Sequence, residues 1–139
     1  MPVHTEEFTV RCRERCDMAD VTDRVQAALS TSGLQDGIAC VSVVGSTAGV
    51  STIEYEPGLR RDVPELMERI VPSDRPYAHD DTWGDGNGFS HLRSFLTGTS
   101  FTAPFHEGRL LLGTWQQIVV LNFDNRDRER RVVVQLVGE

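Results

Sequence analysis

Two of the chain's four histidines, His79 and His91, lie twelve positions apart in the stretch YAHDDTWGDGNGFSHL, residues 77–92. Neutral imidazole is the commonest protein ligand for zinc-like ions, and two imidazoles with a carboxylate make an open catalytic metal site. A histidine in a loop is more often a surface residue that forms hydrogen bonds, so spacing alone does not decide between these roles. The pair is a candidate divalent-metal site if the fold brings both rings into one polar pocket.

The acidic residues between the two histidines resemble a calcium-binding loop, with Asp80, Asp81 and Asp85 as apparent ligands. Such a loop needs oxygen ligands at fixed positions and ends in a bidentate glutamate. Here Trp83 falls where the third ligand should be, and Leu92 falls where the glutamate should be. The sequence therefore excludes a calcium loop of this type.

A second segment, GSTAG at residues 45–49, consists of small residues and lies between two predicted strands. Small side chains let backbone N–H groups approach an anion, and Ser46 and Thr47 add hydroxyl donors. An ordinary turn between the two strands would account for these small residues equally well. Glu54, on the strand that follows, is either a solvated carboxylate or one that points into a site.

Several kinds of chemistry are excluded by the composition. The chain contains no lysine, so Schiff-base catalysis, a pyridoxal phosphate anchor and a Walker A phosphate loop are all ruled out. Cys12, Cys16 and Cys40 have no CxxC spacing and are interpreted as buried or incidental thiols in a reducing compartment. No G-x-S-x-G nucleophile elbow occurs. The pattern places His106 in an exposed turn and Trp115 in the core.

The bulk properties predict one domain over residues 1–139. A formal net charge of −7 argues against nucleic-acid binding, which needs a basic face, and is compatible with a cationic cofactor. The N-terminal segment lacks the features of a signal peptide, and no run of 18 apolar residues exists to span a membrane. We expect a cytoplasmic protein that acts on neither nucleic acid nor membranes.

The hydrophobic periodicity predicts an α+β fold with a largely antiparallel β-sheet, two main helices and one short helix. Asp20 is expected to cap the first helix and Gly33 to end it, and Pro64 is expected in the first turn of the second. Residues 124–127, DNRD, are expected to form a hairpin connection. Expected strands are 6–15, 37–45, 49–56, 99–108, 109–124 and 128–138, and expected helices are 20–34, 59–71 and 90–98.

In the short helix, Leu92, Phe95 and Leu96 are expected to share one face, and Gly98 is expected to end the helix. Beyond these elements, the chain resembles one protein family in the order H…SHL…LTGTS…P…GRL…GTWQ and in STAGVSTIEYEPGL. These pieces resemble the YjbQ-like proteins, a group sometimes labelled secondary thiamine-phosphate synthases. The resemblance covers essentially the whole chain. It implies an α+β fold that assembles as a homotrimer, with sites in clefts near subunit boundaries.

The resemblance also implies that His79 and His91 belong to a polar pocket that binds a divalent metal, zinc or magnesium. Many relatives begin the STAG segment with a histidine, whereas this chain has Gly45, so Glu54 or Asp80 is the expected third ligand. Glu54 joins the two histidines as an expected catalytic residue. The expected substrate-binding residues are Ser46, Thr47, Arg93, Thr99, Ser100, Arg109 and Gln116.

The function implied by the resemblance is the joining of a pyrimidine pyrophosphate to a thiazole phosphate, with release of pyrophosphate. Such a catalyst must neutralise charge on the leaving group and hold two anions together. One alternative is a metal-assisted hydrolase with water on the open position of the ion. Another is a non-catalytic trimeric module that binds a small anionic metabolite.

Overall fold

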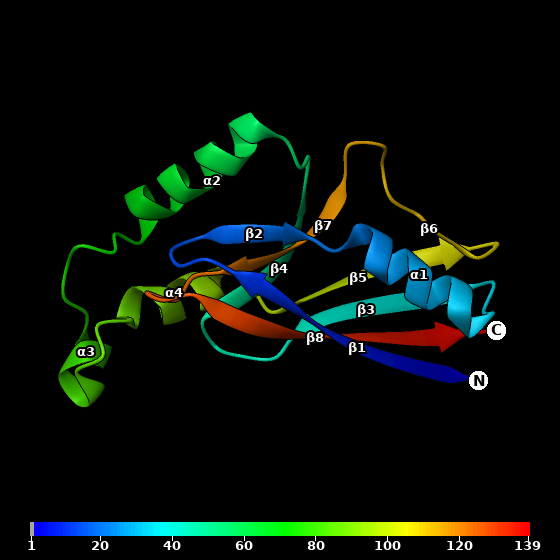
Figure 1. Ribbon diagram of the computed structural model, residues 1–139, viewed down its shortest axis with the longest axis horizontal. Coiled ribbons are helices and arrows are strands. Elements are labelled where there is room, and N and C mark those ends of the chain that lie inside the picture. Colours follow the sequence, from blue (N-terminus) through cyan, green and yellow to red (C-terminus); the bar gives the residue numbers. More distant parts are fainter. Residues whose placement is uncertain (1) are drawn as a thin grey trace.

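Two antiparallel sheets form the body of the protein (Figure 1), and a computed structural model describes residues 2–139. The larger sheet has the strand order β1-β8-β3-β5-β6, and the smaller has the order β2-β7-β4. Every strand pairing is antiparallel among the described residues, which confirms the predicted α+β class. The strands are β1 (Val3–Cys12), β2 (Asp17–Asp20), β3 (Gly37–Val43), β4 (Ala48–Ile53), β5 (Ser100–His106), β6 (Arg109–Leu110), β7 (Gln117–Asn122) and β8 (Arg128–Gly138).

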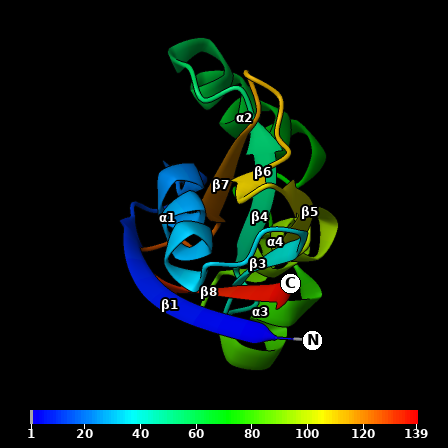
Figure 2. The same cartoon turned by 90° about the vertical axis from the view of Figure 1, so that its right-hand side faces the viewer.

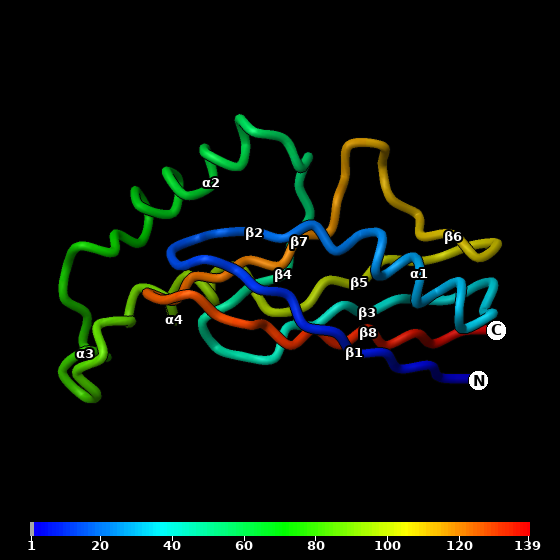
Figure 3. Tube along the Cα trace, in the orientation of Figure 1, coloured from blue at the N-terminus to red at the C-terminus, as the bar shows by residue number. Residues whose placement is uncertain are grey.

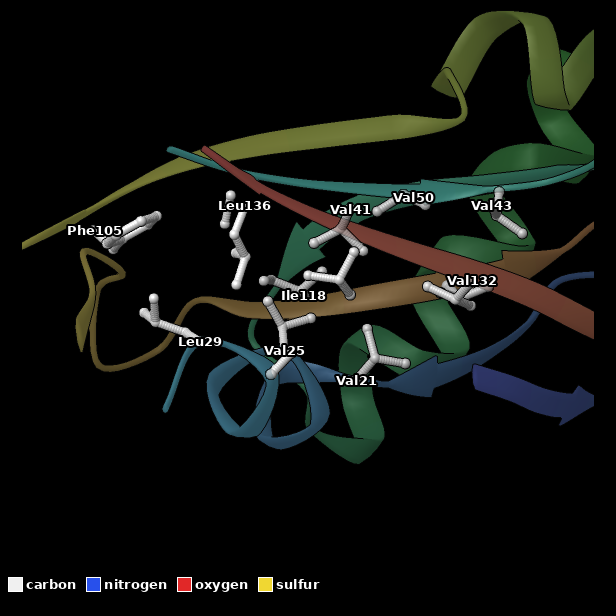
Figure 4. Close-up of a cluster of buried hydrophobic side chains, with 14 of the residues drawn as sticks. Val21, Val25, Leu29, Val41, Val43, Val50, Phe105, Ile118, Val132 and Leu136 are labelled. Atoms are coloured by element: carbon white, nitrogen blue, oxygen red, sulfur yellow. The ribbon is translucent and has the colours of Figure 1, made fainter. Parts of the chain in front are cut away.

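The core lies between the two sheets and under the first helix, α1 (Thr22–Ser32) (Figures 2 and 4). On β8 every second side chain is buried, and Val132, Val134 and Leu136 face the inner layer. This alternation follows from the strand's period of two residues. The first and last strands pair along their length, so the two termini lie at the same end of the molecule (Figure 3).

The remaining helices are α2 (Pro57–Ile70), α3 (Ala78–Trp83) and α4 (Gly88–Thr97). The boundary of α2 differs from the prediction: Glu56 accepts hydrogen bonds from the Gly58 and Leu59 N–H groups, so the helix begins at Pro57 and Pro64 lies inside it. In α1, Gly33 ends the helix with a positive φ as predicted, but Val21 is the residue at the cap. No described helix is long and apolar enough to cross a membrane.

The C-terminal third departs most from the sequence prediction. The single strand expected over residues 109–124 is interrupted by a loop at 111–116, which leaves Trp115 71% exposed rather than in the core. Residues 124–127 do not close a hairpin, since β7 and β8 belong to different sheets. This bend carries the chain from one layer to the other.

The short helix α4 turns its apolar residues toward solvent. Its buried residues are small, polar or charged apart from Phe89, whereas Phe95 is 85% exposed. Leu92 and Leu96 are also exposed, and these three residues are named here the apolar side of α4. Helical periodicity identified the stripe correctly but could not say whether this chain's own core covers it.

Candidate functional site

The two histidines are brought together at the junction of α3 and α4. His79 is the second residue of α3, a helix not expected from the sequence, and His91 is the fourth of α4. Asp80 joins the helices, because its carboxylate accepts hydrogen bonds from the N–H groups of Tyr77 and Gly88, both at 3.0 Å. A Cβ on Gly88 would lie 2.7 Å from the Tyr77 Cβ, so only glycine permits this approach.

The imidazole rings of His79 and His91, named here the histidine pair, have centroids 4.4 Å apart and planes inclined by 48°. Both side chains are partly exposed. One bend of the chain therefore brings the two rings close together, although only His91 is among the residues that line the neighbouring pocket. Two partly solvated imidazoles at this separation can share a proton, a ligand or an ion.

Polar neighbours orient His79. Its Nε2 lies 3.1 Å from the side-chain amide of Asn87 and 3.6 Å from a carboxylate oxygen of Asp85. With its amide nitrogen turned to this side, Asn87 donates to His79 Nε2 and to Asp85 together. In this arrangement Nε2 is an acceptor, which places the proton of neutral His79 on Nδ1.

His91 also lines a pocket of about 310 Å³ between α4 and the loop before β4. The pocket is positioned by hydrogen bonds across the junction: Ser94 Oγ donates to the Ala48 carbonyl at 2.6 Å, and Val43 N–H donates to the Thr99 carbonyl at 2.9 Å. Ser46 and Thr99, both expected at the substrate, line it. The lining residues are Gly45, Ser46, His91, Ser94, Phe95, Gly98 and Thr99.

The expected third metal ligand does not join the histidine pair. Among residues 2–139, no group of three or more His, Cys, Asp or Glu side chains is placed to hold one ion. Both carboxylate oxygens of Asp80 are occupied by backbone N–H groups. Glu54 follows the far end of β4, about 20 Å along the strand from Ala48, at about 3.3 Å per residue. One chain thus offers two imidazole ligands, whereas a tetrahedral zinc site has about four ligands.

Arg93, expected at the substrate, lies instead in the interior. It is 1% exposed, and its guanidinium donates to the Val71 carbonyl at 2.9 and 3.1 Å and to Glu68 at 2.6 Å. Although burial by itself raises the pKa of Glu68, hydrogen bonds from Ser73 and Arg93 outweigh it and lower that pKa. The arginine therefore ties α4 to the end of α2.

Three further residues expected at the substrate are not among those that line this pocket. Ser100 is exposed at the start of β5, and Arg109 is exposed in the short strand β6. Gln116 lies in the loop before β7, where its side chain donates to Thr52 Oγ1 at 3.3 Å and accepts from the Gly113 N–H at 3.0 Å. Of the residues expected at the site, Ser46, His91 and Thr99 line this one pocket.

A buried polar cluster beneath the 45–49 loop was not expected from the sequence. Asp124 is 1% exposed and accepts from Arg128 Nε at 2.8 Å. Thr47, expected to face substrate, donates its hydroxyl to Asp124 at 3.3 Å and accepts from Arg130 at 2.7 Å. Asn122 accepts from Arg130 at 2.6 Å. The sequence hints at this cluster only through an apolar segment at residues 117–123, followed by the turn DNRD and the charged residues at 128–131.

Comparison with known proteins agrees with this architecture. The chain matches the family model described as UPF0047 protein YjbQ-like over residues 6–139. A UPF0047 protein of Archaeoglobus fulgidus is 37% identical over 129 residues, covering 93% of this chain and 98% of the relative. Another, from Methanothermobacter thermautotrophicus, is 37% identical over 139 residues, covering 100% and 95%.

Solved structures give the same result. A hypothetical protein from Aeropyrum pernix K1 superimposes with a TM-score of 0.90 at 37% identity, covering 97% of this chain and 98% of that one. A protein of unknown function from Sulfolobus solfataricus P2, described as YbjQ-like, reaches a TM-score of 0.93 at 29% identity, covering 99% of each chain. On the family match and these identities, the chain belongs to the YjbQ-like UPF0047 family.

Proposed function

We propose that the protein is an enzyme acting on small phosphorylated metabolites, with an activity like that of thiamine-phosphate synthase. The observation that carries the proposal is the double position of His91. Its ring centroid lies 4.4 Å from that of His79, with the ring planes inclined by 48°, and His91 also lines the pocket at Gly45 and Ser46. An imidazole pair next to exposed small residues combines two metal-ligand groups with room for an anion.

In the proposed reaction, the thiazole nitrogen forms a bond to the methylene carbon of the pyrimidine pyrophosphate. The carbon–oxygen bond to pyrophosphate breaks, and the leaving group takes the electron pair. Ser46 would bind the leaving group through its hydroxyl, and His79 and His91 would hold an ion that neutralises part of its charge. Asn87 and Asp85 would keep His79 oriented beside His91.

The histidine pair would also hold a divalent ion in this proposal, with the Asn87 oxygen turned to accept from His79 Nε2–H so that His79 Nδ1 is free to bind the ion. Two imidazoles per chain fit such an ion only in part, so its remaining ligands would come from substrate oxygens, water or a neighbouring subunit. When bound, the ion would supply positive charge opposite the leaving pyrophosphate.

The homotrimer implied by the family is part of the same proposal. The apolar side of α4 lies beside the pocket, and Phe95 belongs to both. An exposed patch of large apolar side chains next to a functional pocket is typical of an interaction surface. A neighbouring copy of the chain seated on Phe95 would bury this patch and close the pocket.

The first test is removal of the histidine pair. We expect His79→Ala and His91→Ala to lose bound divalent metal and turnover of the two precursors while melting close to the wild-type temperature, because both side chains are partly exposed. His106→Ala is the matched control, since His106 is exposed and bonded to Asp36. Elemental analysis, precursor turnover and thermal melting are measured for all four proteins.

Equal trace turnover in wild type and His91→Ala would mark the activity as contamination and refute the synthase proposal. Turnover of phosphate esters lost in His91→Ala would instead favour the hydrolase. Metal-free protein that still binds metabolite with unchanged affinity would favour the non-catalytic module.

The second test concerns assembly. We expect Phe95→Asp to convert the oligomer into monomers, because a carboxylate at a buried contact is strongly unfavourable. Trp115→Ser is the control, since Trp115 is also largely exposed but lies in the 111–116 loop. Mass measurement by light scattering during gel filtration distinguishes the two. A wild-type protein that is monomeric at high concentration would refute the trimer.

A further inference from the structure

Arg130 lies directly behind the 45–49 loop and uses only part of its hydrogen-bonding capacity. It is 6% exposed. Its Nη2 donates to the Thr47 carbonyl at 3.0 Å and to Asn122 at 2.6 Å, and its Nε donates to Asn122 at 3.2 Å. None of these bonds uses Nη1, and no described side chain or carbonyl accepts from that nitrogen.

The free nitrogen faces Gly45. A Cβ placed on Gly45 would lie 3.1 Å from Arg130 Nη1, and no other described heavy atom outside its chain neighbours lies within 4 Å of that position. The place that a side chain would occupy is therefore open and within hydrogen-bond distance of a guanidinium. Because Gly45 is exposed and lines the pocket shared with His91, the opening is reachable from solvent.

The charge balance beneath the loop also favours an anion. Asp124 pairs with Arg128, whereas Arg130 donates, within residues 2–139, only to the uncharged oxygens of Thr47 and Asn122. The positive charge of Arg130 therefore has no described carboxylate within ion-pair distance, although the whole chain carries −7. Burial lowers the pKa of Arg130, while Asp124 opposes that change.

We propose that Arg130 is an anion-binding residue of the pocket, reached through the space left by the missing side chain of Gly45. Its ligand is a phosphate or pyrophosphate group of a small metabolite, whose oxygens accept charge-assisted hydrogen bonds from Nη1. Gly45 is then the residue that admits the anion, and Thr47 holds the guanidinium from behind. The inference deepens the proposed function, since it names the residue that would receive the anionic end of the substrate.

The test is calorimetric titration of the full-length protein with inorganic pyrophosphate in buffer containing a chelator. We expect Gly45→Ala to weaken binding by about tenfold or more, because a methyl group would cover Nη1 and remove a charge-assisted hydrogen bond. Gly33→Ala is the matched control: Gly33 also has a positive φ, of 73° against 152° at Gly45, but lies at the end of α1. It should bind pyrophosphate like the wild type.

Arg130→Lys provides a second readout, since it keeps the charge but loses the planar fork, and we expect it to weaken binding as well. Unchanged affinity in Gly45→Ala, or a wild type that does not bind pyrophosphate, would overturn the inference. Because the chelator removes divalent ions and no turnover is measured, this result is independent of the metal and synthase tests. Pyrophosphate binding that persists in inactive, metal-free protein supports the anion site alone.

Discussion

Replacing Arg93 with alanine is expected to lower the free energy of unfolding by about 2–5 kcal/mol, the range for truncating a large buried side chain to alanine. The guanidinium is 1% exposed and makes three hydrogen bonds, two to the Val71 carbonyl and one to Glu68. Without it, the Val71 carbonyl loses its side-chain donor, and a cavity opens between α4 and the end of α2. Chemical denaturation at neutral pH measures the change.

Arg69→Ala is the control for this prediction, because Arg69 pairs with Glu65 at 4.0 Å on the exposed surface of α2. Exposed pairs of this kind contribute about 0–1 kcal/mol. If Arg93→Ala were as stable as wild type but lost pyrophosphate binding, the arginine would be a ligand residue, as the sequence first suggested, and its structural role would be refuted.

The second large effect is expected for Asp124→Asn. The change removes the charge of a buried side chain that accepts from Arg128, Thr47 and the Asn125 N–H. Because Arg128 is 36% exposed and water screens part of its charge, we expect a cost of about 1–3 kcal/mol. We therefore expect a marked loss of stability at pH 7 in thermal or denaturant unfolding. Glu7→Gln is the control, since Glu7 pairs with Arg131 on the surface and should change little.

The pH dependence provides a second check on Asp124. Burial by itself raises its pKa, but hydrogen bonds from Arg128 and the Asn125 N–H outweigh burial and hold the pKa below its ordinary value of 3.8. A depressed folded-state pKa means that the stabilisation is complete above pH 3.8 and is lost as pH falls through the lower value. The stability difference between wild type and Asp124→Asn should therefore shrink in acid. A difference independent of pH would contradict this account.

The sequence correctly predicted those helices and strands in which one face packs against the protein's own hydrophobic core. Val132, Val134 and Leu136 alternate because one face of β8 is buried, and Val25, Ala28 and Leu29 follow the helical period for the same reason. The pattern failed where another influence decided the structure. The Glu56 side chain caps α2, so the helix begins two residues before the predicted start. Residues 111–116 have a composition typical of a strand but form a loop, which exposes Trp115.

The candidate site was predictable only in part. His79 and His91 were identified by residue type, but their approach depends on Asp80 and on Gly88, which periodicity does not single out. The sequence alone does not show which of Arg93 and Arg130 can reach a ligand. Neither residue donates from Nη1 to a described side chain or carbonyl, but Arg93 is 1% exposed, whereas Arg130 Nη1 faces the open position at Gly45. Burial and hydrogen-bond geometry decide this difference.

The position of α3 at one end of the molecule has a consequence for ligand affinity (Figure 1). This six-residue helix buries none of its side chains, and its link to α4 includes the Asp80 bond to Gly88. It can detach without disturbing the sheets, so its local opening equilibrium is separate from global unfolding. The measured dissociation constant of any ligand bridging both imidazoles then equals the intrinsic value divided by the fraction of molecules in which α3 is docked.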